Sequence, residues 1–201
     1  MILIGYSGHA FVVYGILQAA GKNVTGYCDV IEKKYNPFNL PWFGTENSVT
    51  ALNTIKQKGY FIAVGDNLLR SKIYANLQQQ KLFPVNAIHP SAVIDPSATI
   101  AGSGVMIAAN ASINPLATIG KGAICNTSCI IEHECVVGEF AHIGPGAVLC
   151  GNVKIGDGSF VGANAVIRQG ISIGKNAMIG AGAVVIKDVA DNITVVGVPA
   201  K

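Results

Sequence analysis

The chain has 201 residues, of which 50% are hydrophobic and only 12% are charged, and its formal net charge is +3. A charge this small, with no cluster of Lys and Arg, argues against a nucleic-acid-binding protein. No apolar run is long enough to span a bilayer, and the apolar start lacks the basic flank of a signal peptide. We therefore expect a cytoplasmic protein of one or two domains, without a nucleic-acid or membrane partner, that buries weakly charged surface against other subunits.

The N-terminal part of the chain alternates short apolar runs with helical patterns. The predicted strands and helices, separated after the second strand by a Pro-containing loop at residues 32–44, lie in chain order at residues 1–5, 10–20, 24–28, 46–58, 60–64, 67–80 and 85–88. Strands that alternate with helices predict a small parallel sheet of βαβ units. Residues 1–85 are therefore expected to form a Rossmann-like α/β domain.

Several residues suited to ligand binding follow the predicted strands. The turn 5–9 opens a helix, so its free N–H groups and the helix dipole favour an anion, although a plain strand-to-helix turn explains it as well. The three-glycine spacing of a dinucleotide site is absent, and Ser7 does not stand in a nucleophile motif. Asp29 and Gly65 follow the next strands. Because parallel strands end at one edge of a sheet, these residues should line one crevice.

The rest of the chain repeats every six residues. From Ile107 to Val184 a branched aliphatic or Leu recurs at this spacing, interrupted only by Cys125, with a small or apolar residue four positions later and Gly often one position later. Neither a helix nor a hairpin strand has this period. It is typical of a left-handed parallel β-helix, in which Gly is expected to turn the corners. We assign residues 86–201 to this domain, with a tail after Val185 that leaves the repeat and an open end that the N-terminal domain can cap.

Within the repeat, Glu132, His133 and Glu134 interrupt the small residues at a corner. Inward positions belong to Ile131 and Cys135, so the His133 side chain should point outward. Neighbouring carboxylates can orient an imidazole and favour its protonated form, which suits a general base. A solvated surface histidine is the alternative. His142, nine positions on, is also expected to face outward but not to stack on His133, and the cysteines lack zinc-site spacing, so no metal is expected.

The repeat, the final Gly-Val-Pro-Ala-Lys and the N-terminal Gly-x-Ser-Gly-His together resemble the hexapeptide acyltransferases that acetylate sugars, the sialic acid O-acetyltransferase type among them. The segment 126–142 most resembles the UDP-4-amino-sugar N-acetyltransferases of bacillosamine synthesis. The resemblance implies a homotrimer with active sites between subunits, acetyl-CoA as co-substrate, and a sugar nucleotide held by the N-terminal domain.

The same resemblance implies roles for individual residues. The catalytic base falls on His133 and its supporting acid on Glu134. Contacts to the sugar nucleotide fall on Ser7, Gly8, His9, Asp29, Gly65, Asn126 and Glu132. Positions that line the acetyl-CoA groove fall on His142, Ala163 and Ala181. Val30 departs from the family pattern, which has a second acid there, so recognition of the base or ribose stays open.

Three other functions remain compatible with the sequence. The first two are N-acetylation of GDP-perosamine and O-acetylation of a sialic acid or related hydroxyl, for which the nucleotide base and the acceptor atom would differ. The third is a sugar-nucleotide-binding trimer without catalysis, which an assay for release of coenzyme A would separate from the enzymes.

Overall fold

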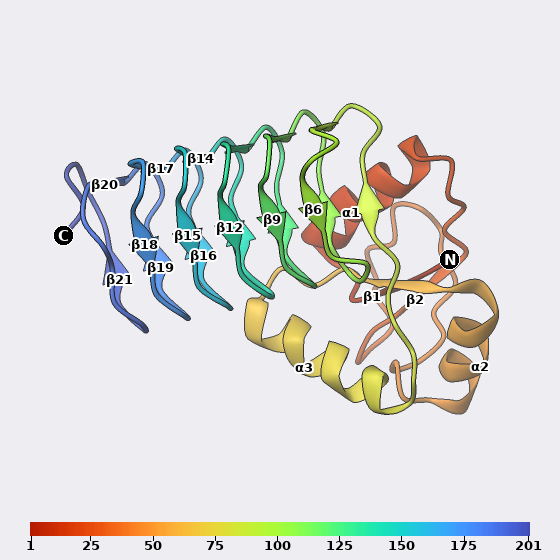
Figure 1. Ribbon diagram of the computed structural model, residues 1–201. Coiled ribbons are helices and arrows are strands. Elements are labelled where there is room, and N and C mark those ends of the chain that lie inside the picture. Colours follow the sequence, from red (N-terminus) through yellow and green to blue (C-terminus); the bar gives the residue numbers. More distant parts are fainter.

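The computed structural model describes all 201 residues and divides them into a small α/β domain and a long coil (Figure 1). The α/β domain has a parallel three-stranded sheet in the order β2-β1-β3. Its elements are β1 (Ile2–Ile4), α1 (Gly8–Ala19), β2 (Gly26–Cys28), α2 (Val49–Lys58), β3 (Tyr60–Ile62) and α3 (Asn67–Gln79). The predicted order of strands and helices is thus confirmed, with boundaries moved by up to three residues.

The central strand β1 is buried on both faces because helices cover both sides of the sheet. Leu3 points to the side of α1 and belongs to a cluster with Val13 and Leu17. Its neighbours Ile2 and Ile4 point to the opposite side, where they join Ile55 of α2 and Leu77 of α3. Alternate side chains of a strand face opposite ways, so three apolar residues in a row suit a sheet covered twice.

The coil consists of two-residue strands, β4 to β21, that form three parallel sheets of seven, six and five strands. Paired residues are 18 apart through the regular part of the coil, for example Ile124 with His142, so each turn takes three hexads. The left-handed parallel β-helix predicted from the repeat is confirmed. The strands are β4 (Ala87–Ile88), β5 (Val93–Ile94), β6 (Thr99–Ile100), β7 (Met106–Ile107), β8 (Ser112–Ile113), β9 (Thr118–Ile119), β10 (Ile124–Cys125), β11 (Ile130–Ile131), β12 (Val136–Val137), β13 (His142–Ile143), β14 (Val148–Leu149), β15 (Lys154–Ile155), β16 (Phe160–Val161), β17 (Val166–Ile167), β18 (Ser172–Ile173), β19 (Met178–Ile179), β20 (Val184–Val185) and β21 (Thr194–Val195).

Three rows of turns join the sheets, and we name them by position. Corner 1 leads from the seven- to the six-stranded sheet (residues 126–129 and their equivalents 18 residues apart). Corner 2 leads from the six- to the five-stranded sheet (132–135, 150–153), and corner 3 from the five- to the seven-stranded sheet (120–123, 138–141, 156–159). The aliphatic series and the small residues point inward and form one core of 28 buried residues. Ser159 is the polar member of the inward row, and its hydroxyl bonds the Gly174 carbonyl and the Ala177 N–H.

The corners turn by a different route from the one that the sequence suggested. The glycine after each aliphatic residue does not take a positive φ; the residue two positions later does, as at Glu134 (φ 60°) and Asn152 (φ 55°). The glycine is required by close approach instead. A Cβ at Gly138 would lie 2.7 Å from the Asp157 N and 2.8 Å from the Gly156 carbonyl carbon of the next coil.

Three other expectations need correction. Residues 87–88 pair with β7 and start the coil, rather than adding a strand to the N-terminal sheet. The tail after Val185 winds on through β21, which pairs with β19. The N-terminal domain covers the flank of the first coils, since Met106 and Ile124 of the seven-stranded sheet are buried in one cluster with α1 residues. None of the helices is both long and apolar enough to cross a membrane.

Candidate active site

The expected crevice at the carboxyl ends of the N-terminal strands is built around Asp29. Its Oδ2 accepts a hydrogen bond from the Tyr6 N–H (2.9 Å). Its Oδ1 accepts a hydrogen bond from the Val30 N–H (2.7 Å) and forms an ion pair with Lys33 Nζ (3.0 Å). Both oxygens thus hold the loops in place. Asp29 therefore shapes the crevice, and a direct contact with a ligand would have to share these acceptors.

The turn before α1 lies beside Asp29. Ser7 is the exposed N-cap residue, and its side chain makes no capping bond. Gly8 begins the helix, and a Cβ added there would have no atom within 4 Å, so a side chain would project into open space. His9 packs against the loop that follows β3. A Cβ added at Gly65 would lie 3.5 Å from His9 Cγ. The structure thus brings Ser7, Gly8, His9, Asp29 and Gly65 to one edge of the sheet.

The crevice meets the coil at His142. This side chain points out of β13, as expected, but the N-terminal domain covers it, so that it is only 8% exposed. Asn126 Nδ2 lies 3.1 Å from its Nε2, and the His9 and Phe160 rings lie 6.2 and 4.9 Å from its ring. Neither His142 Nδ1 nor His9 Nε2 has a hydrogen-bond partner.

Burial weakens both of these imidazoles as bases. Loss of hydration, aided by the nearby positive charge of Arg70, lowers the pKa of His9 to about 4 and that of His142 to about 3. Both rings are therefore neutral at pH 7. A neutral imidazole with one free ring nitrogen can still form a single hydrogen bond with a bound ligand through that nitrogen.

Arg70 fastens the N-terminal domain to the coil, a contact that the sequence pattern did not reveal. The side chain is 1% exposed, and burial lowers its pKa to about 10, so it stays charged at neutral pH. It donates hydrogen bonds of 2.8 to 3.1 Å to five acceptors: Val64 O, Gly65 O, Asn67 Oδ1, Gly122 O and Phe140 O. The backbone of the crevice at Gly65 is thereby tied to corner 3.

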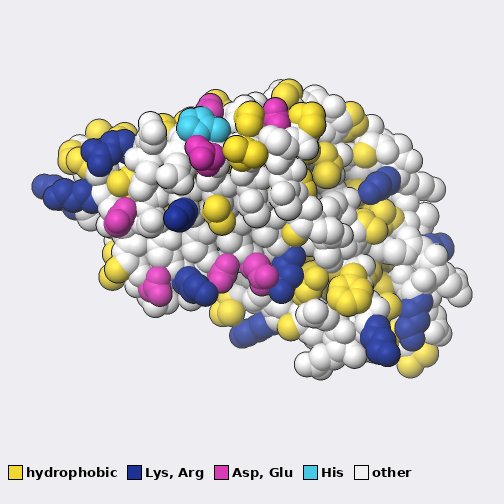
Figure 2. Space-filling view, viewed as in Figure 1, with side chains coloured by type: hydrophobic (Ala, Val, Ile, Leu, Met, Phe, Trp, Pro, Cys, Tyr) yellow, Lys and Arg dark blue, Asp and Glu magenta, His cyan; other side chains and the backbone are white.

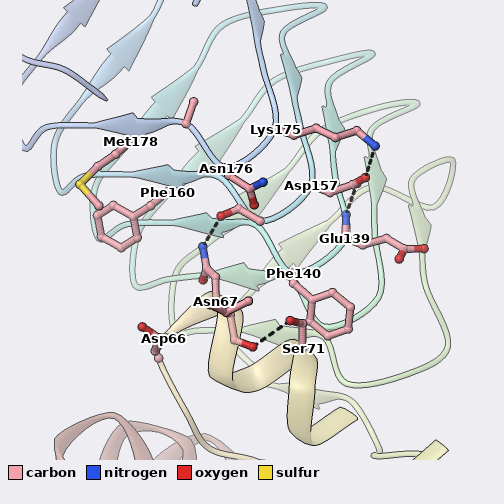
Figure 3. A pocket seen from close by; sticks show the side chains of 14 residues that line it. Asp66, Asn67, Ser71, Glu139, Phe140, Asp157, Phe160, Lys175, Asn176 and Met178 are labelled. Atoms are coloured by element: carbon pink, nitrogen blue, oxygen red, sulfur yellow. Dashed lines mark hydrogen bonds and ion pairs between the residues drawn. The ribbon is translucent and has the colours of Figure 1, made fainter. Parts of the chain in front are cut away.

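A cavity of about 740 Å³ opens next to this contact, between the start of α3 and the later coils (Figure 3). Phe160 and Met178 form its apolar wall, and Asn67 crosses one end, where its Nδ2 donates to the carbonyls of Gly158 and Ser159 (2.9 and 3.2 Å). Gly65 lines the cavity and also lies at the crevice, so the two adjoin at this residue.

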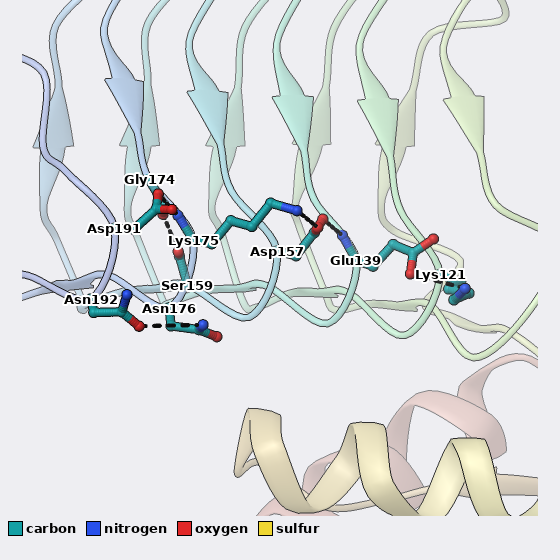
Figure 4. Close-up of polar contacts among 9 residues, drawn as sticks. All are labelled: Lys121, Glu139, Asp157, Ser159, Gly174, Lys175, Asn176, Asp191 and Asn192. Carbon is teal, nitrogen blue, oxygen red and sulfur yellow. Dashed lines mark hydrogen bonds and ion pairs between the residues drawn. The ribbon is translucent and has the colours of Figure 1, made fainter.

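The far wall of the cavity is corner 3, which carries a row of acidic and basic side chains (Figures 2 and 4). Lys121 Nζ pairs with Glu139 and Lys175 Nζ pairs with Asp157, each at 2.9 Å. The Asp157 carboxylate also accepts from the Glu139 N–H (3.0 Å), and Asp191 accepts from the Lys175 N–H (2.7 Å). Each charge bonds a neighbouring coil, so this row holds the stacking of the coils.

His133 and Glu134 lie at corner 2, as the repeat predicted. The His133 side chain is 51% exposed, and its Nδ1 is 3.1 Å from Glu134 Oε2. An Nδ1–H donated to this carboxylate leaves Nε2 unprotonated, and Nε2 makes no hydrogen bond within the chain. Glu132 precedes them, half-buried and without a side-chain bond. Corner 2 thus presents an oriented imidazole to solvent.

Ala163 and Ala181 lie at corner 1 of successive coils. The Gly182 N–H donates to the Ala163 carbonyl (2.8 Å), and a Cβ at Gly162 would clash with the Ala181 backbone. Small side chains thus line this edge, which continues through Gly144 to Asn126 in the earlier coils. An elongated ligand could lie along such an edge.

The predicted site residues therefore fall into two groups within one chain. Asn126 and His142 lie next to the crevice, and Ala163 and Ala181 lie at corner 1 of later coils. Glu132, His133 and Glu134 belong to corner 2, across the six-stranded sheet. In Figure 1 the five-stranded sheet faces the viewer, with α3 below its lower edge and the turns from β14 and β17 along its upper edge. The structure does not bring the two groups together in a single subunit.

Comparisons with known proteins match both halves of the chain. The PglD N-terminal domain family matches residues 1–77, the bacterial transferase hexapeptide family (six repeats) matches 134–169, and the hexapeptide repeat of succinyl-transferase matches 152–187.

Solved structures match the chain over its whole length. A His-to-Asn variant of perosamine N-acetyltransferase from Caulobacter crescentus, in complex with CoA and GDP-perosamine, is 37% identical, with 100% of this chain and 94% of that chain covered and a TM-score of 0.92. The acetyltransferase domain of PglB from Neisseria gonorrhoeae, in complex with acetyl coenzyme A, is 34% identical, with coverages of 100% and 97% and a TM-score of 0.90.

A more distant structure, WeeI from Acinetobacter baumannii, is 25% identical, with coverages of 100% and 97% and a TM-score of 0.80. The fold, the two family regions and the full-length identity agree with the resemblance seen in the sequence. The chain belongs to the hexapeptide-repeat sugar acetyltransferases that carry a PglD-type N-terminal domain, and it is an acyltransferase enzyme.

Proposed function

We propose that the enzyme transfers an acetyl group from acetyl-CoA to the 4-amino group of a nucleotide-linked amino sugar, with His133 as general base. The observation that carries this proposal is the His133–Glu134 pair on an exposed corner of the coil, with Nε2 unoccupied. The relatives support the substrate class, because the Caulobacter structure holds CoA and GDP-perosamine and the Neisseria structure holds acetyl coenzyme A.

In the proposed reaction, His133 Nε2 takes a proton from the sugar amine as its nitrogen attacks the thioester carbonyl. Glu134 holds Nδ1–H and stabilises the imidazolium that forms. The new C–N bond replaces the C–S bond, the coenzyme A thiolate leaves, and the imidazolium returns a proton to it. The Gly151 N–H makes no hydrogen bond within the chain and lies on the coil next to the ring, where it can stabilise the oxyanion.

Because one subunit separates its two groups of site residues, the proposed enzyme is a homotrimer whose sites form between subunits. The outer face of the six-stranded sheet supports this assembly. Its outward side chains are aliphatic in five of six coils, and Val93 and Ile130 are 67% and 36% exposed. Contact through this sheet would carry His133 at corner 2 of one subunit to corner 1 and the crevice of the next. A row of aliphatic side chains that remain partly exposed is typical of a subunit interface.

Each ligand has a place in this arrangement. Acetyl-CoA would lie along corner 1, beside Ala163 and Ala181, with its thioester near His142. The sugar nucleotide would lie in the crevice, with its phosphates at the start of α1 near Ser7, Gly8 and His9 and its sugar toward Asn126. Glu132 of the neighbouring subunit would approach the sugar together with His133.

The substrate proposed first is a UDP-linked 4-amino sugar of the bacillosamine type. GDP-perosamine is the second candidate, and the 37% identity to the Caulobacter enzyme favours it. The Asp29-Val30 pair gives only one acid at the position where the base or ribose would bind, and that acid is already engaged with Tyr6 and Lys33. Recognition of the nucleoside would then depend on backbone groups of this loop.

The test is release of coenzyme A thiol with UDP-linked 4-amino sugar, GDP-perosamine and CMP-sialic acid, with the product identified by mass and by amide formation. Turnover of either amino sugar, lost in His133→Ala, supports the proposal. If only CMP-sialic acid is acetylated, the protein is an O-acetyltransferase and the proposed N-acetylation is wrong. Binding of a sugar nucleotide without thiol release from any of the three would favour a scaffold.

A further inference from the structure

One position of corner 2 stacks from coil to coil. Pro115, His133, Gly151 and Gln169 occupy it in succession. The backbone bonds establish the equivalence: Glu134 N donates to Pro115 O (3.0 Å), Asn152 N to His133 O (2.8 Å) and Gly170 N to Gly151 O (3.0 Å). Glycine occurs in this row only in the coil that follows His133.

The backbone does not need glycine at this position. The left-handed residue of each turn is the next one, with φ of 60° at Glu134, 55° at Asn152 and 73° at Gly170, while Gly151 lies outside that region. Proline, histidine and glutamine fill the same place in the other coils. A glycine whose backbone any residue could adopt is explained by the space that its missing side chain leaves.

The His133 imidazole fills that space. A Cβ at Gly151 would overlap His133 Cε1, and it would lie 2.5 Å from Nε2 and 3.2 Å from Nδ1. Carbon atoms in contact prefer about 3.5 to 4.0 Å, so the ring could not stay where it is. The contact of Nδ1 with Glu134 Oε2, at 3.1 Å, depends on this ring position. The His133 backbone is fixed separately, through its carbonyl bond to Asn152.

We infer that Gly151 is a positioning residue for the reaction: its bare Cα provides the seat on which the His133 ring rests with Nδ1 against Glu134. The inference depends on the proposed role of His133 as general base. It adds that the coil above the base, and not only the adjacent carboxylate, sets the direction of its free nitrogen.

The first experiment compares Gly151→Ala with Gly102→Ala in the full-length protein. Gly102 is exposed, and a Cβ there would have no atom within 4 Å, so the same chemical change meets open space. Gly151→Ala should lower kcat about 10- to 100-fold on the amino sugar that the wild type turns over, with KM for acetyl-CoA little changed, because small misplacement of a catalytic group is costly. Gly102→Ala should match the wild type. A Gly151→Ala enzyme with wild-type kcat would overturn the inference.

The second experiment asks whether the effect passes through His133. Added to His133→Ala, Gly151→Ala should cause no further loss of kcat, since no ring remains to displace. An equal loss in both backgrounds would overturn the inference. If Gly151→Ala alone fails to fold, the double variant should fold, and failure of both would contradict steric conflict with the ring.

A third readout does not depend on activity. In histidine-labelled protein, Gly151→Ala should shift the ring Cε1–H signal of His133 and its pH titration, and leave those of His9, His89 and His142 in place. An unchanged His133 signal would contradict the inference that Gly151 positions the ring. If the signal moves as expected but His133→Ala remains active, Gly151 does position the ring, but the proposed role of His133 as general base is wrong.

Discussion

At the scale of single residues, the four histidines differ in what surrounds them. His142 is buried, its Nδ1 has no hydrogen-bond partner, and its pKa of about 3 makes it a poor proton acceptor at neutral pH. His133 is half-exposed and has a carboxylate on one nitrogen. General-base catalysis is most efficient when the pKa of the base lies near the working pH. His142 is therefore better suited to hold a ligand than to replace His133 as base.

Substitution of His133 separates these roles. His133→Ala should fold normally, because the side chain lies outside the apolar core, and its kcat should fall about 100- to 10,000-fold. His89→Ala removes a histidine from the start of the coil and serves as the control, with wild-type kcat expected. Steady-state kinetics on the same sugar nucleotide measure both. A His133→Ala enzyme with kcat within about threefold of wild type would show that another group takes the proton.

The buried histidines predict how stability depends on pH. The pKa values of His9 and His142 in the folded chain, about 4 and about 3, lie below the 6.5 of an unperturbed histidine. The unfolded chain therefore binds more protons below pH 6.5. The contribution of the two neutral rings to the free energy of unfolding should be fully present above pH 6.5. It should fall as the pH drops toward 4, by about 2 kcal/mol for each ring at pH 5.

Thermal unfolding from pH 7.5 to 4.5 measures this dependence. In the double variant His9→Asn, His142→Asn, stability should decline much less between pH 6.5 and 5 than in the wild type, whatever its value at pH 7. The same slope in wild type and variant would mean that neither buried ring is the source.

At the scale of elements, helix α3 couples the crevice to the coil. Arg70 reaches from its first turns to carbonyl groups at corner 3 that lie 52 and 70 positions further along the chain. The same side chain bonds the carbonyls of Val64 and Gly65, which begin the loop before α3. A buried cation with five acceptors leaves several unsatisfied carbonyls when it is removed.

Arg70→Met should therefore destabilise the protein by about 3 kcal/mol or more, as the loss of a buried hydrogen-bond network does. It should also raise KM for the sugar nucleotide more than KM for acetyl-CoA, because the crevice loses its fixed wall. Arg70→Lys keeps the charge and part of the bonding, so it should fall between wild type and Arg70→Met in both measurements. Equal rises in both KM values would argue against a specific tie to the crevice.

The elements also show what could be predicted from the sequence. The βαβ order and the coil follow from local period and apolar runs, so both were predicted. The flank position of the N-terminal domain depends on contacts such as Met106 with the α1 cluster and Arg70 with Gly122, which no local pattern encodes. The glycines after each aliphatic residue were seen, but their cause, the nearness of the next coil, appears only in three dimensions.

The candidate site divides in the same way. Glu132, His133 and Glu134 break the repeat and could be found from the sequence alone. Gly151 and Arg70 could not, because a glycine among many glycines and one arginine in a polar helix carry no local signal. Gly151 becomes conspicuous only once the 18-residue stacking of corner 2 is known.

At the scale of the whole molecule, the exposed face of the six-stranded sheet is the feature that predicts assembly. Its outward row is Val93, Ser112, Ile130, Val148, Val166 and Val184. Wild-type protein should sediment as a trimer of the 20.8 kDa chain. Val148→Glu places a charge in the middle of this row and should lower both trimer content and activity, while Val136→Glu, on the five-stranded sheet, should preserve both. A fully active monomer would contradict an interface site.

Mixed trimers test whether His133 of one subunit serves the crevice of another. His133→Ala lacks the base, and Gly8→Val blocks the crevice with a side chain that the fold leaves room for. Each variant should be nearly inactive alone. Unfolded, mixed in equal amounts and refolded together, they should recover about a quarter of wild-type activity, because random assembly gives that share of interfaces two intact partners. If the mixture stays as inactive as its components although mixed trimers form, base and crevice belong to the same subunit, which contradicts a site between subunits.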